Sequence, residues 1–85
     1  MLATPIRLPA QLGVLLRNAR LSRGLTQADV ARELGITAQA LSKLENNAAK
    51  ASFDRIHRLC QVLSLEMMLQ EKPAMNLRDS AGAEW

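Results

Sequence analysis

Apolar residues recur at steps of three and four over most of residues 9–64, the spacing of the buried face of an α-helix. The pattern is interrupted at Gly24, at Gly35 and over residues 46–51, so it divides into four short amphipathic segments. We therefore predict an all-α domain of four short helices over residues 9–64. The side chains expected to point inward are Leu12, Leu15, Leu16 and Ala19, then Val30, Ala31 and Leu34, then Leu41 and Leu44, and finally Phe53, Ile56, Leu59, Cys60 and Leu63.

The residue types at these interruptions agree with the predicted helix limits. Gly24 and Gly35 suit the left-handed backbone that commonly ends a helix, and Pro9 suits a first helical turn. Hydroxyl side chains stand where the three later helices are expected to begin, and the first of them has an acid three residues on, the pattern of a capping box. These residues are Thr26 (with Asp29), Thr37 and Ser52.

Two connections between the predicted helices differ in character. Ile36 is an apolar residue in a turn, so we expect it to lie beneath the helices on either side of that turn. Residues 46–51 contain two Asn and one Lys and show no helical periodicity. We therefore expect them to form a polar connection.

The segments outside the helical domain carry weaker signals. Residues 1–8 are expected to be an extended arm, and residues 72–85, which have few apolar anchors, a flexible tail. Leu65, Met67 and Leu69 stand at alternate positions of residues 65–71, which predicts a short strand. An isolated strand is not stable in water, so its expected partner is the same segment of a second copy. The residues expected to carry this dimerisation are Leu65, Met67 and Leu69.

Composition narrows the class of protein without identifying it. The chain has one Phe, one Trp and no Tyr, so its core must be aliphatic. Residues 1–65 carry nine Lys/Arg against four Asp/Glu, whereas residues 66–85 carry two against four. A basic body suits a polyanionic partner, although an ordinary surface explains a charge of this size equally well. The single cysteine, the absence of a secretion signal and the absence of a long apolar run favour a cytoplasmic location with no membrane contact.

The spacing of the second and third predicted helices carries most of the functional information. A short helix ends at Gly35, a three-residue turn follows, and the next helix begins near Ala38. This is the arrangement of a helix-turn-helix unit, which crosses two helices steeply and leaves the second one exposed. Within residues 16–47 the sequence therefore predicts a helix that can enter the major groove of DNA.

The same stretch resembles the lambda-repressor/Cro-type (XRE-like) helix-turn-helix proteins over residues 10–65. The most specific part of the match is the pair of strings Gly24-Leu25-Thr26-Gln27 and Leu41-Ser42-x-x-Glu45. The resemblance implies sequence-specific binding to double-stranded operator DNA. It also implies a structural ion pair between Arg20 and Glu45, which would hold the exposed helix in place.

The resemblance also assigns roles to residues near the exposed helix. Gln39 can form a bidentate contact with adenine, and Lys43 can donate to guanine or to phosphate. The complete set of expected base contacts is Thr37, Ala38, Gln39, Ser42 and Lys43. Amide, hydroxyl and ammonium groups at the two flanks are expected to contact DNA phosphates. They belong to Thr26, Gln27, Asn46, Asn47 and Lys50.

Within this family the layout is similar to that of HipB-type antitoxins. The similarity lies in Ser42-x-x-Glu45-Asn46-Asn47, in the strand-like residues 65–69 and in the terminal Glu84-Trp85. It implies a homodimer that represses its own operon and binds a HipA-like kinase toxin, with Trp85 as a candidate toxin-binding residue. Two alternatives remain open at this point: a stand-alone phage-like or metabolic regulator without a toxin, and a protein-interaction module that has lost DNA binding.

Catalytic and metal-binding functions lack support in the sequence. His57 is the only histidine and has no ligand partner at a suitable spacing, and Cys60 lies on an apolar helix face. The chain has no glycine-rich phosphate loop, no nucleophile elbow and no clustered carboxylate pair. We therefore expect a protein that is not an enzyme and that needs no cofactor or metal.

Overall fold

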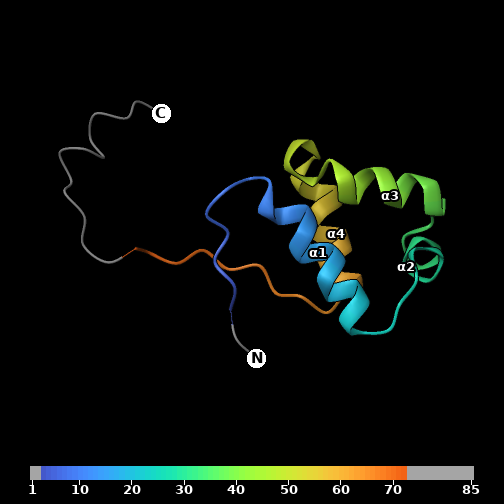
Figure 1. The fold of residues 1–85 in the computed structure, drawn as a ribbon, viewed down its shortest axis with the longest axis horizontal. Coiled ribbons are helices and arrows are strands. Elements are labelled where there is room, and N and C mark those ends of the chain that lie inside the picture. The colour runs from blue at the N-terminus through green and yellow to red at the C-terminus, as the bar shows by residue number, and fades with distance from the viewer. Residues whose placement is uncertain (1–2, 73–85) are drawn as a thin grey trace.

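The computed structural model describes residues 3–72, and these form four α-helices and one short 3-10 helix. The α-helices are α1 (Gln11–Ser22), α2 (Gln27–Leu34), α3 (Ala38–Asn46) and α4 (Phe53–Val62), and the 3-10 helix is η1 (Ala48–Lys50) (Figure 1). The predicted all-α domain of four short helices is confirmed. No helix in the described part of the chain is both long and apolar enough to cross a membrane.

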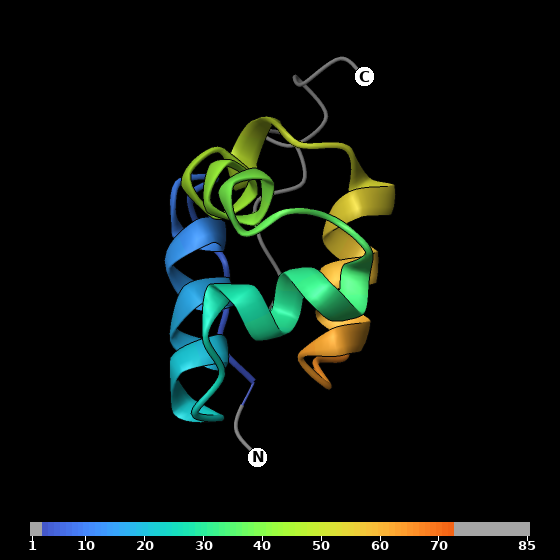
Figure 2. The ribbon, with the colours of Figure 1, turned by 90° about the vertical axis from the view of Figure 1, so that its right-hand side faces the viewer.

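The packing of the helices places α3 at one end of the domain (Figure 2). In Figure 2, α1 and α4 run in similar directions on opposite sides, and α2 crosses the space between them. α3 is seen along its length in Figure 1 and end-on in Figure 2, whereas α2 shows the reverse, so these two helices cross steeply. α2 packs against α3 and α4, while α1 packs against α3 and η1.

The core is aliphatic, as the composition required, and one residue from each predicted stripe lies at its centre. Leu16, Val30, Leu41 and Leu59 are each at most 2% exposed. Cys60 is 3% exposed and belongs to the same cluster, and burial raises the pKa of its thiol. Burial disfavours the charged thiolate, so Cys60 behaves as a small apolar core residue.

Two apolar residues that we expected to be inside lie on the surface. Phe53 is 68% exposed because it is the first residue of α4, where its ring stacks on His57 with centroids 5.7 Å apart. Ile36 is 38% exposed, although its backbone N–H donates to the carbonyl of Ala31 and closes α2. Periodicity identifies the inward face of a helix, but it does not show how far neighbouring elements extend to cover that face.

The connection after α3 is more ordered than its composition suggested. α3 continues through Asn46, and Ala48–Lys50 form η1 rather than an irregular polar loop. Ala48 is only 3% exposed and belongs to the core. The methyl group of alanine gives little hydropathy signal among polar neighbours, so its burial depends on how closely α1 approaches this turn.

The segments before α1 and after α4 are each held to the helical domain by backbone hydrogen bonds. The side-chain carbonyl of Gln11 accepts hydrogen bonds from the backbone N–H groups of Arg7 and Leu8 at 2.6 and 2.8 Å. At the other end Ser64 has a left-handed backbone (φ 57°), and Leu65 N–H donates to the carbonyl of Cys60 at 2.8 Å. Residues 65–72 then continue without helix or strand in this single chain, so the strand that needs a second copy stays a prediction.

Candidate nucleic-acid interface

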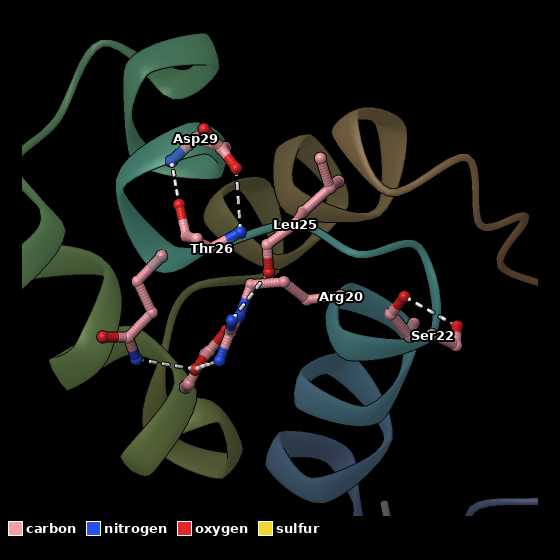
Figure 3. Close-up of polar contacts among 8 residues, drawn as sticks. Arg20, Ser22, Leu25, Thr26 and Asp29 are labelled. Atoms are coloured by element: carbon pink, nitrogen blue, oxygen red, sulfur yellow. Dashed lines mark hydrogen bonds and ion pairs between the residues drawn. The ribbon is translucent and has the colours of Figure 1, made fainter.

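The start of α2 is fixed by a reciprocal pair of hydrogen bonds. The hydroxyl of Thr26 accepts from the N–H of Asp29 at 3.0 Å, and the carboxylate of Asp29 accepts from the N–H of Thr26 at 2.9 Å (Figure 3). This is the capping box that the sequence pattern predicted. The bonds from the backbone and side chain of Thr26 favour the ionised acid and lower the pKa of Asp29.

The turn between α2 and α3 is short because Gly35 adopts a left-handed backbone with φ 73°. A residue with a side chain would be strained there, whereas glycine is not. Thr37 then caps α3, since its hydroxyl accepts from the N–H of Ala40 at 3.0 Å. Two local devices, one glycine and one hydroxyl, therefore set the direction in which α3 leaves the domain.

α3 has one buried face and one exposed face. Leu41 is completely buried and Glu45 is 5% exposed, whereas Gln39 and Lys43 lie on the exposed side. The five candidates for base contact follow that exposed side from the cap through the first two turns of the helix. Thr37, Ala38, Gln39 and Lys43 are exposed, and Ser42 is half-buried.

The candidates for phosphate contact lie beside the two ends of this exposed face. Thr26 and Gln27 stand at the start of α2, where first-turn N–H groups have no acceptor within the helix. Asn46, Asn47 and Lys50 are exposed at the end of α3 and in η1. The amide of Asn47 also donates to the carbonyl of Lys43 at 3.2 Å and so closes the last turn of α3.

One further cation shares this surface and was not among the DNA contacts predicted from the sequence. A hollow between α1 and the end of α3 is lined by Asn46, Asn47 and Lys50 and also by Arg17 from α1. Arg17 is exposed. Its place beside Lys50 follows from the packing of α1 against η1, which no local sequence signal reports.

Beneath α3, Arg20 and Glu45 form the ion pair that the resemblance implied. The Nε atom of Arg20 lies 2.7 Å from Oε2 of Glu45, and the two side chains are 7% and 3% exposed. Arg20 also donates through Nη1 to the carbonyl of Leu25 at 3.0 Å (Figure 3). Every buried side-chain nitrogen and oxygen in the described chain has a hydrogen-bond partner. The pair therefore ties α1, the loop before α2 and α3 together without an unpaired buried charge.

Gly13 allows α1 to approach the end of α3, and sequence reasoning had passed it over. A Cβ atom at this position would collide with the backbone carbonyl oxygen of Glu45 and would lie 3.6 Å from Cβ of Ala48. A glycine inside a helix lowers helix stability, so its presence there usually has a packing reason. A glycine within the predicted helix was therefore the one feature of the sequence that could have indicated this close contact.

Comparison with known proteins agrees with the helix-turn-helix geometry of the structure. The helix-turn-helix family model matches residues 16–68. The antitoxins HipB of Escherichia coli O6:H1 and of Escherichia coli K12 are 33% and 31% identical over 61 residues, which is 72% of this chain. The matched part spans about two thirds of the relatives' own length, 65% and 69% respectively.

Solved structures of HipB share the fold as well. A complex of a HipB variant with an O2 20-mer has a TM-score of 0.75 and 29% identity, covering 85% of this chain and 100% of that one. A HipA–HipB–O2–O3 complex has a TM-score of 0.75 and 28% identity, covering 84% of this chain and 100% of that one. The family is one of DNA-binding domains and not of enzymes. The chain therefore belongs to the XRE-type helix-turn-helix family, as a relative of the HipB antitoxins.

Proposed function

We propose that this protein is a sequence-specific repressor that inserts α3 into the major groove of double-stranded operator DNA. The observation that carries the proposal is the exposure of Gln39 and Lys43 on a helix whose opposite face is buried. Gln39 suits adenine, and Lys43 suits guanine or phosphate. Thr37, Ala38 and Ser42 are small enough to let base edges and thymine methyl groups come close.

Phosphate contacts on both sides would fix the register of α3 in the groove. Gln27 and Thr26 would contact one stretch of backbone, and Asn46, Asn47 and Lys50 another. Such contacts position a protein without reading sequence, and those made by cations make affinity depend on salt.

A second copy of the chain is the proposed partner of residues 65–71. Leu65 packs against the core, but the apolar side chains after it are poorly covered, with Met67 40% exposed and Leu69 104% exposed. Within residues 3–72, no backbone hydrogen bond reaches beyond Leu65 in this segment. Pairing of Leu65, Met67 and Leu69 with the same segment of another copy would cover the exposed side chains and supply the missing backbone hydrogen bonds. A two-fold dimer would present two α3 helices about one turn of DNA apart.

The similarity to HipB supports a more specific role as the antitoxin of a HipBA-type module. In this role the protein represses its own operon and binds a HipA-like kinase toxin, which places it in the compartment of the bacterial chromosome. The support comes from the two HipB relatives and from the solved complex that contains HipA. The candidate toxin anchor, Trp85, lies outside the described residues 3–72.

The repressor proposal is tested by measuring affinity for the DNA upstream of the protein's own gene at several salt concentrations. Lys50 is the one cation among the proposed phosphate contacts of each copy, so a dimer would neutralise two phosphates in this way. Affinity should then fall roughly tenfold between 50 and 200 mM salt. An unrelated duplex of equal length serves as the control and should bind at least about a thousandfold more weakly. Equal affinity for both duplexes would contradict sequence-specific binding. No binding to either duplex would leave the protein-interaction module as the better explanation.

The antitoxin proposal is tested by expressing the native operon with a tag on this chain and purifying it. We expect a kinase-sized product of the same operon to copurify with the chain in amounts close to one to one. An operon without such a product, or a product that does not copurify, would favour the stand-alone regulator. Size measurement by light scattering on the same sample checks the proposed dimer.

A further inference from the structure

The buried carboxylate of Glu45 serves more than Arg20. Its Oε2 atom accepts from Nε of Arg20 at 2.7 Å, while its Oε1 atom accepts from Nε2 of Gln27 at 3.1 Å and from Nη2 of Arg20 at 3.4 Å. Gln27 is the first residue of α2 and Glu45 belongs to the last turn of α3. The side chain of a candidate phosphate contact is thus hydrogen-bonded to the far end of the exposed helix.

This bond decides which end of the Gln27 amide faces inward. The oxygen and nitrogen of a glutamine amide have nearly the same shape, so packing alone does not distinguish its two orientations. An ionised carboxylate only accepts hydrogen bonds, and it therefore selects the orientation in which nitrogen faces Glu45. Ala38, at the start of α3, offers only a methyl group and cannot select either orientation.

The remaining groups of Gln27 suit an anion. Nε2 carries a second N–H that the bond to Glu45 does not use, and the half-buried Gln27 stands beside first-turn N–H groups that have no acceptor within the helix. Arg20 neutralises Glu45, so the carboxylate places no uncompensated negative charge next to an incoming phosphate.

We infer that Glu45 is a positioning residue for DNA binding: it fixes the amide of Gln27 as a hydrogen-bond donor to a DNA phosphate before DNA arrives. The inference rests on the proposed function, since it concerns how the same interface is prepared. A glutamine that is already held in place loses less rotamer freedom on binding. The gain is specific to Gln27 and separate from the support that the ion pair gives to the fold.

The first test observes the side-chain amide of Gln27 in the native chain without DNA. By NMR we expect one of its two N–H protons to exchange slowly with water and to be displaced from the position of a free amide. Gln39 is the matched control, because it is exposed and its side chain makes no hydrogen bond among the described residues. If the two amides behave alike, the inference is wrong.

The second test is a double-mutant cycle on DNA affinity, with Gln27→Ala, Glu45→Gln and the combined variant. A neutral amide at position 45 no longer selects the orientation of Gln27. We expect Glu45→Gln to weaken binding roughly fivefold more in the native background than in the Gln27→Ala background. Equal effects in both backgrounds would show that Glu45 acts only through the fold and would overturn the inference.

The two tests separate this inference from the function on which it rests. A native chain that binds its upstream DNA but shows no coupling contradicts only the role of Glu45. A native chain that binds no DNA contradicts the proposed function, and the inference falls with it. If Glu45→Gln does not fold, a Gln27 amide that behaves like a free amide in the native chain still overturns the inference.

Discussion

The two faces of α3 differ in nearly every physical respect although they share nine residues. On the inner face, Leu41 and Glu45 are buried and fully partnered by the rest of the domain. On the outer face, Gln39 and Lys43 are exposed, and their side chains make no hydrogen bond or ion pair among the described residues. The inner face therefore determines where the helix stands, and the outer face determines what it can bind. Substitutions on the two faces should separate stability from recognition.

The largest effect should follow the loss of the buried acid. Glu45→Ala leaves Arg20 as an unpaired charge in the interior and should lower the free energy of unfolding by about 3–5 kcal/mol. Urea denaturation monitored by circular dichroism measures the change.

The matched control removes an acid from an exposed ion pair. Asp54 and Arg58 lie 3.3 Å apart on α4, with side chains 74% and 71% exposed. Asp54→Ala should change stability by less than about 0.5 kcal/mol. Similar losses in Glu45→Ala and Asp54→Ala would mean that burial of the pair contributes little to stability.

Gly13→Ala tests the contact that holds α1 against the inner side of α3. Alanine favours a helix over glycine by about 1 kcal/mol, but here its methyl group would collide with the Glu45 carbonyl. A backbone atom cannot move aside as a flexible side chain can, so we expect a net loss of about 1–3 kcal/mol.

Asn18→Ala, at an exposed position of the same helix, is the control for this substitution. It should change stability by less than about 0.5 kcal/mol. The same urea titration serves both variants. A Gly13→Ala protein that is more stable than the native chain would show that helix propensity outweighs the close approach.

The features that sequence reasoning found are those that depend on neighbouring residues in the chain. The capping box of Thr26, the left-handed Gly35 and the exposed side of α3 all follow from residues within a turn or two of one another. Their physical causes are local, so their patterns are visible without the fold. The family resemblance added the Arg20–Glu45 pair, which joins residues 25 positions apart.

The features that sequence reasoning missed depend on how closely two helices approach each other and on where each helix ends. Gly13 and Ala48 matter because α1 lies close to the end of α3. Phe53 is exposed because its helix begins there, and the bond from Gln27 to Glu45 depends on the crossing of α2 and α3. A one-dimensional pattern contains the faces of helices but not the distances between them.

On the outer face, Gln39→Ala should alter recognition and leave stability nearly unchanged. If Gln39 contacts adenine with both ends of its amide, its loss should reduce discrimination at particular base pairs by about 1–3 kcal/mol. Affinities for operator duplexes with single base-pair changes measure this effect. An equal loss on every duplex, including unrelated DNA, would instead assign Gln39 to the phosphate backbone.

Lys50→Ala should have a smaller effect of a different kind. One phosphate contact fewer should weaken binding to every sequence and should reduce the slope of log affinity against log salt by about one. Arg58→Ala is the control, since Arg58 lies on α4 and pairs with Asp54. An unchanged slope in Lys50→Ala would remove Lys50 from the phosphate surface.

The smallest effect concerns Asp29, the acid of the capping box at the start of α2, and it should depend on pH. Hydrogen bonds from Thr26 hold the pKa of Asp29 below its ordinary value of 3.8. A lowered pKa in the folded chain means that the contribution of Asp29 to stability is complete above its ordinary pKa and is lost as pH falls through the folded-state pKa. The native chain should therefore exceed Asp29→Asn in stability at neutral pH, and the difference should shrink as the carboxyl protonates.

Urea titrations at a series of pH values between about 2 and 7 measure this difference for the native chain and Asp29→Asn. A difference that is not zero but stays constant with pH would contradict the lowered pKa of Asp29. A difference close to zero at every pH would show that the hydrogen bonds of Asp29 do not require its charge. In that case asparagine would cap α2 as well as aspartate, because its side-chain oxygen can accept the same bond from Thr26 N–H. The start of α2 would then depend on the geometry of its hydrogen bonds and not on the charge of Asp29.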